Sequence, residues 1–171
     1  MSNLSQINMQ FRPADDRLLL KSNELAEFRF WMTRRFVKGL WPALVNCLAS
    51  NEVVIGQTQK QAKQTVLTFQ HESAVAQSNF ESSDDSVVTS APLGDKPLLL
   101  TRANLKRNET NQPVLGLYPV TGQGIELAVD ETMLHSFCQL LAQSVDKSGW
   151  DMKLGLGSVP IPSDPANQSV N

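Results

Sequence analysis

The sequence has few of the residues and none of the motifs that commonly carry chemistry. It contains two cysteines and two histidines in 171 residues, and no CxxC, GxSxG, HExxH or Walker A pattern. Because no nucleophile–base pair or set of metal ligands stands at a recognisable spacing, the sequence predicts no catalytic residue, metal site or cofactor. We expect a protein that is not an enzyme and has no evident small-molecule substrate.

Long apolar runs and a strong charge of one sign are missing as well. No apolar stretch approaches the roughly 18 residues needed to span a bilayer, and residues 1–16 lack the basic and apolar segments of a secretory signal. A net charge of −2 argues against a dedicated, highly basic nucleic-acid binder. The expectation is a cytosolic protein with no membrane partner.

What the sequence does contain is a pattern that occurs twice. When residues 17–48 are shifted by 97 positions onto residues 114–145, the apolar residues coincide. Each copy alternates apolar and polar residues, as in a β-hairpin, and continues with apolar residues three and four apart, as in an amphipathic helix. Thr33 and Asp130 stand where the N-cap of each helix is expected.

A further strand is predicted before each hairpin, so the order β-β-β-α occurs twice. The fold class is α+β, with antiparallel sheets packed on helices and a possible pseudo-twofold arrangement if the halves pack alike. The predicted organisation is a single domain over residues 1–153, made of repeat one (6–50), a connecting helix (57–80), a mobile acidic loop (81–97) and repeat two (98–149), followed by a disordered tail (154–171).

The connecting helix has apolar or small residues at alternating spacings of four and three, which predicts a thin heptad seam. The seam residues are Ala62, Val66, Phe69, Ser73, Ala76 and Phe80. The simpler interpretation is a helix that packs across its own domain along this seam. An intersubunit contact through the same residues is the alternative.

One candidate binding surface stands out from this background. If Phe28, Phe30 and Met32 face the helices, then Arg29 and Trp31 face outward on the same strand. Basic residues on the neighbouring strands would join them, and others begin the following helix. The candidate binding residues are Arg12, Arg17, Lys21, Arg29, Trp31, Arg34, Arg35 and Lys38.

These residues are compatible with two kinds of partner. Tryptophan and arginine are enriched at protein-interface hot spots, so the leading hypothesis is a protein-interaction or accessory subunit, with a protein partner or self-association. The first alternative is a single-stranded DNA or RNA binder, because an exposed indole stacks on bases and cations bind phosphates. An enzyme of unknown class is the second alternative. In the second copy Glu126 and Ala128 replace Arg29 and Trp31, so a symmetric nucleic-acid platform is not expected.

Overall fold

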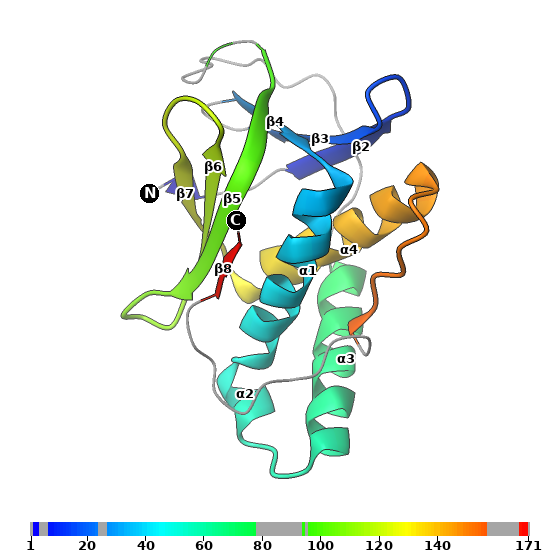
Figure 1. Ribbon diagram of the computed structural model, residues 1–171. Helices are drawn as coiled ribbons and strands as arrows, with labels where there is room; N and C mark the ends of the chain where they lie inside the picture. The colour runs from blue at the N-terminus through cyan, green and yellow to red at the C-terminus, as the bar shows by residue number, and fades with distance from the viewer. Residues whose placement is uncertain are drawn as a thin grey trace.

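The computed structural model describes residues 2–3, 7–23, 27–77, 94, 96–156 and 168–170. Within these residues it has eight strands in one mixed sheet and four helices, which are shown in Figure 1. Strands and helices therefore form the α+β class that the sequence predicts.

The first unit is an antiparallel meander that leads directly into a helix. Its elements are β2 (Ile7–Arg12), β3 (Arg17–Asn23), β4 (Glu27–Met32) and α1 (Arg34–Ala49). Alternation along the strands places Leu18 and Phe30 on the face that packs against the helices. The side-chain oxygen of Thr33 accepts a hydrogen bond from the backbone N–H of Phe36 at 3.2 Å, so α1 begins at its expected N-cap.

The second unit repeats this order of elements. It consists of β5 (Leu98–Arg107), β6 (Pro113–Pro119), β7 (Ile125–Ala128) and α4 (Glu131–Ser148). Asp130 caps α4 by accepting a hydrogen bond from the N–H of Met133 at 2.6 Å. Gly149, with a positive φ of 70°, ends the helix. Two β-β-β-α units are thus confirmed.

Two short parallel pairs join the units into a sheet that curls back on itself. β4 pairs with β5, and β1 (Ser2–Asn3) pairs with β7. Because only three residues separate β1 from β2, the two ends of the sheet are at most about 15 Å apart. β4, the third strand of the first unit, therefore lies beside β5, the first strand of the second. β7, the third strand of the second unit, lies beside β1, which precedes the first unit, as a pseudo-twofold arrangement requires. The paired residues are Phe30 with Leu98, Trp31 with Leu99, Ser2 with Leu127 and Asn3 with Ala128.

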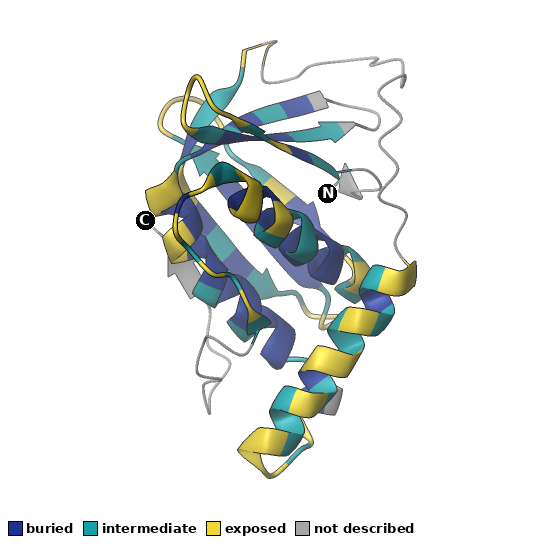
Figure 2. Ribbon diagram, turned by 90° about the vertical axis from the view of Figure 1, so that its right-hand side faces the viewer, coloured by how far each residue is buried: buried dark blue, intermediate teal, exposed yellow. Residues whose placement is uncertain are grey.

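Each of the two long core helices also packs on a strand of the other unit. α1 packs on β5 of the second unit, α4 packs on β2 of the first, and the two helices contact each other. Positions 97 apart are buried in both units, for example Phe30 and Leu127, which are 1% and 4% exposed. Figure 2 shows these buried segments between the strands and the helices. The two units consequently share one hydrophobic core.

The connecting segment forms α2 (Glu52–Ile55) and α3 (Lys60–Gln77), and α3 packs against α4, α2 and α1. Its buried residues are Leu67 and Ala74, whereas Phe69 in the expected seam is 69% exposed. The helix therefore lies within the domain, but it packs through a different face from the one that the heptad pattern predicts. Three of the six seam residues are small, and the face with Leu67 is the one that tertiary packing buries.

The end of the chain is more ordered than its composition predicts. Trp150 is buried, and its indole N–H donates to Asp16 at 2.6 Å. Beyond it, Met152, Leu154 and Leu156 pack against the core, and Gln168–Val170 forms β8, which pairs with β5. The expected disorder of residues 154–171 is thus corrected for 154–156 and 168–170, because alternate apolar residues reach the core and β5 offers a free edge.

The expected acidic loop at residues 81–97 lies outside the described residues, apart from positions 94, 96 and 97. None of the helices that the structure describes is both long and apolar enough to cross a membrane.

Candidate binding surface

The outer face of the β2–β3–β4 meander is turned away from the helices and carries the strand residues that the sequence singles out. Lys21 lies opposite Arg29, and Arg12 lies opposite Arg17. Residues that pair across neighbouring strands project from the same face of a sheet. The four cations therefore form two basic rows, which lie four residues apart along the strands, or about 13 Å.

An apolar row lies between these two basic rows. Leu19, Trp31 and Leu99 stand side by side on β3, β4 and β5. Leu19 is only 5% exposed, while Trp31 and Leu99 are half-buried. Neighbouring rows on one face are about 7 Å apart, so cations flank the indole on both sides. Below, "outer face" means the seven residues Arg12, Arg17, Leu19, Lys21, Arg29, Trp31 and Leu99.

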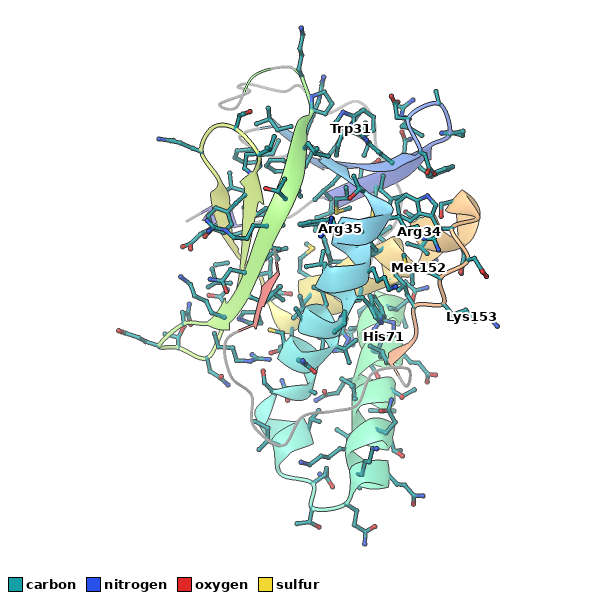
Figure 3. The ribbon with its side chains drawn as sticks, in the orientation of Figure 1. Trp31, Arg34, Arg35, His71, Met152 and Lys153 are labelled. Atoms are coloured by element: carbon teal, nitrogen blue, oxygen red, sulfur yellow. The ribbon has the colours of Figure 1, made fainter. Side chains whose placement is uncertain are left out.

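The connecting helix does not cover this outer face. α3 packs against the other three helices, and these lie on the opposite side of the meander. Figure 3 shows Trp31 above β4, away from α1. Within the part of residues 57–80 that the structure describes, nothing covers Trp31. Such coverage would have excluded the candidate binding surface.

The three remaining candidate residues belong to a different side of the molecule. Arg34, Arg35 and Lys38 are exposed on the first turns of α1. Figure 3 shows Arg34 and Arg35 on the helix side of the meander, below Trp31. The structure thus brings together the five strand residues but not the three helix residues. The latter belong to α1, which lies on the helix side of the meander.

Three of the four cations of the outer face are little neutralised by neighbours that the structure describes. Within the described residues, Arg12, Arg17 and Lys21 form no ion pair. The exposed turn between β2 and β3 contains two aspartates, but Asp16 accepts the hydrogen bond from Trp150. These guanidinium and ammonium groups are available to a partner.

The corresponding face of the second unit is neutralised internally. Glu126 pairs with Lys106 at 3.2 Å and accepts a hydrogen bond from the Tyr118 hydroxyl at 3.0 Å. These two hydrogen bonds lower the pKa of Glu126, and partial burial together with the bond to Glu126 raises the pKa of Tyr118. The guanidinium of Arg102 lies 4.5 Å from the centre of the Tyr118 ring. Its charges and its aromatic ring therefore have partners within the unit.

The structure also brings together the two histidines, which are 64 residues apart in the chain. The Nδ1 atoms of His71 on α3 and His135 on α4 are 3.0 Å apart, and His71 Nε2 is 3.2 Å from the amide oxygen of Gln139. That oxygen can only accept, so His71 donates from Nε2 and accepts at Nδ1 from His135. His135 is 3% exposed, and burial, aided by the charge of His71, lowers its pKa to about 4. The His135 ring is therefore neutral at pH 7, and the pair joins α3 to α4.

Arg107 holds the two helices of the core in place. Its guanidinium donates to the carbonyl of Cys47 at 2.8 Å and to the hydroxyl of Ser50 at 2.7 Å, at the end of α1. It also forms an ion pair with Glu131 in the first turn of α4. Arg107 thus supplies a donor to a carbonyl at the end of α1 and an ion-pair partner to the first turn of α4, which is a structural role.

The curled sheet and α4 line an apolar hollow with about 420 Å³ of empty space, including its open side. Among the described residues, no ionisable side chain lines the hollow. Its lining residues are Ile7, Leu20, Ser22, Phe28, Phe30, Leu115, Leu117, Ile125, Leu127, Val129, Met133, Leu134 and Phe137.

The cysteines provide no reactive centre either. Cys47 and Cys138 are both buried and free. Burial raises the pKa of the Cys47 thiol to about 11 and raises that of Cys138 as well, so both thiols are protonated at neutral pH. In the described part of the chain, no three His, Cys, Asp or Glu side chains cluster closely enough to hold a metal ion.

Comparison with known proteins gives no further guide to the site. No protein-family model, curated protein or solved structure matches this chain.

Proposed function

We propose that this protein acts by binding another macromolecule rather than by catalysis, as a protein-interaction or accessory subunit. The supporting observation is the half-buried apolar row of Leu19, Trp31 and Leu99 between two basic rows. Protein interfaces have an apolar, aromatic centre surrounded by a polar rim. The outer face has this composition, and its cations favour a partner with an acidic surface.

The test uses two substitutions on the outer face and two matched substitutions on the second unit. Trp31→Ala and Lys21→Glu should abolish capture of a partner from lysate, and should weaken its binding at least tenfold once the partner is purified. Tyr118→Ala and Lys106→Ala, on the corresponding face of the second unit, should leave the affinity within about twofold. Circular dichroism checks that all four variants fold. Unchanged binding by folded Trp31→Ala and Lys21→Glu variants would show that the outer face is not the interface.

Single-stranded DNA or RNA is the second candidate partner. It is favoured by the position of Trp31, whose indole lies between cations on both sides at a spacing suited to stacking a base between phosphates. Titration of a fluorescent 15-nucleotide oligo(dT) distinguishes the two candidates. If phosphates are the ligand, binding at 50 mM salt should weaken steeply at 200 mM salt and depend on Trp31. No binding at 50 mM salt would exclude this partner and leave the protein partner.

A further inference from the structure

The C-terminal strand β8 occupies one edge of β5. It comprises three residues, Gln168–Val170, which run antiparallel to β5 and lie opposite Ala103, Asn104 and Leu105. α1 packs against β8 from the side. Figure 1 shows β8 between β5 and α1, with the chain end beside it. The chain thus fills a site bounded by a strand edge and a helix with its own last residues.

Most of this edge of β5 has little covering. The opposite edge pairs with β6 along nearly the whole strand. On the edge that holds β8, β4 pairs only with Leu98 and Leu99, and β8 pairs only with Ala103–Leu105. In the described structure, the remaining residues of β5 up to Arg107 have no strand partner there. The edge can therefore pair with a strand longer than β8.

A strand as short as β8 is held weakly. Strands in globular proteins average about five to six residues, and each backbone hydrogen bond contributes only about 1 kcal/mol net. Two features make the edge suitable for a better occupant. Ala103 and Leu105 are buried on the core side of β5, so apolar residues opposite them would also be buried. The backbone of β5 supplies donors and acceptors that fit any extended sequence.

We propose that the edge of β5 beside α1 binds an extended peptide of a partner protein, which pairs antiparallel with β5 and displaces β8. The recognised segment has six or more extended residues, with apolar side chains opposite Ala103 and Leu105. This surface is separate from the outer face, and the inference does not depend on the function proposed above. β8 acts as a built-in competitor, because a tethered strand is present at an effective concentration in the millimolar range.

The first experiment removes the competitor and supplies the strand in trans. The variant ends at Ala166, and the probe is a fluorescein-labelled synthetic peptide with the sequence of residues 160–171, whose strand fits β5 in the structure. Anisotropy titrations should show binding to the truncated protein at least tenfold tighter than to the full chain, since only the full chain carries the tethered competitor. Equal affinity for the two proteins, or no binding to either at 1 mM, would overturn the proposal.

Two altered peptides test whether the peptide binds as a strand. Proline removes a backbone N–H, and successive amides of a strand point to opposite sides, so one of two adjacent residues must donate to β5. At least one of the peptide substitutions Gln168→Pro and Ser169→Pro should therefore weaken binding tenfold or more. Full affinity of both altered peptides would show that no strand forms. Amide NMR shifts on Ala103–Leu105 locate the bound peptide, and shifts confined to other strands would place it elsewhere.

A measurement on the full chain keeps the proposal testable if truncation unfolds the protein. Among the amides of Ala103–Leu105, hydrogen exchange should be at least tenfold faster at those that point towards β8 than at those that point towards β6, because a three-residue strand opens readily. Equal protection would show that β8 does not open. Light scattering of the full chain provides a last check. A dimer that becomes a monomer on truncation would assign the edge to a second copy of this chain and overturn the partner peptide.

Discussion

The two β-β-β-α units have the same core and different surfaces. Leu44 and Leu141 are buried at matching positions on α1 and α4, as are Val37 and Leu134. On the outside, Lys106 of the second unit is paired with Glu126, whereas Lys21 of the first unit has no ion pair among the described residues. The comparison shows that the scaffold constrains only the inward positions. The outward positions are free to differ, and this difference is why the proposed binding surface is placed on the first unit.

The largest loss of stability is expected from variants that each remove one buried side chain of the shared core, one from each unit. Phe30→Ala should lower the free energy of unfolding by about 3–5 kcal/mol and Leu127→Ala by about 2–5 kcal/mol, because each leaves a cavity in close-packed surroundings. Since the core is continuous, both variants should unfold in one urea transition, as followed by circular dichroism. Val120→Ala, at a residue 63% exposed, is the control and should change little. Two separate transitions in either variant would mean that the units are independent.

The contact of the connecting helix α3 with His135 should make the stability of the protein depend on pH. The position matching His135 in the first unit is Lys38, which is exposed. His135 has a pKa of about 4 in the folded state and about 6.5 when unfolded. The unfolded chain thus takes up the proton more readily, and stability that is complete above pH 6.5 falls as the pH is lowered towards 4.

The pH effect amounts to at most about 3 kcal/mol for this one group. Urea titrations from pH 7 to pH 4 should show that His135→Gln flattens this dependence, while Lys38→Gln leaves it as in the parent. An unchanged slope in the His135→Gln variant would assign the acid sensitivity to other groups.

Arg107 gives a sharper contrast between the first strands of the two units. Its side chain is 14% exposed and joins the end of α1 to the start of α4, whereas Gln10 on β2 is exposed. Arg107→Ala should cost about 2 kcal/mol, because it removes the ion pair with Glu131 and the hydrogen bonds to the Cys47 carbonyl and the Ser50 hydroxyl. Gln10→Ala should cost less than about 0.5 kcal/mol. Similar losses in the two variants, measured by urea unfolding, would contradict the structural role of Arg107.

The smallest expected difference concerns the two N-caps. Thr33→Ala and Asp130→Ala should each destabilise the protein by about 1 kcal/mol, since each leaves a helix N–H without its acceptor. The loss should be larger for Asp130, because its carboxylate also interacts favourably with the helix dipole. Thr33→Ser and Asp130→Asn keep an acceptor and should recover most of the loss in thermal unfolding. Failure of these conservative variants to recover stability would mean that the caps act in another way.

The sequence predicts the local structure well because the relevant signals are local. The alternation around Phe28, Phe30 and Met32, the spacing of apolar residues from Phe36 to Leu48, and the caps Thr33 and Asp130 each depend on neighbouring residues. The direction of Trp31 follows from the same alternation, so the five strand residues of the candidate surface could be placed on one face before the structure was known.

Features that depend on distant residues were not predictable in this way. The pairing of Trp31 with Leu99, the contact between His71 and His135, and the strand at Gln168–Val170 each join segments more than 60 residues apart. For α3, the heptad pattern predicts the face of Val66 and Phe69, whereas packing against the other helices buries Leu67 and Ala74. Tertiary packing determines such contacts, and no local pattern encodes them.

The crossed packing of the two units has a consequence for synthesis on the ribosome. The chain before β2 pairs with β7, and β2 itself is covered by α4, yet α4 is completed more than one hundred residues after β4. At about 5–20 residues per second, the first unit waits at least about 5 s for the elements that cover it. During that interval its apolar strand face is open to chaperones and to other nascent chains.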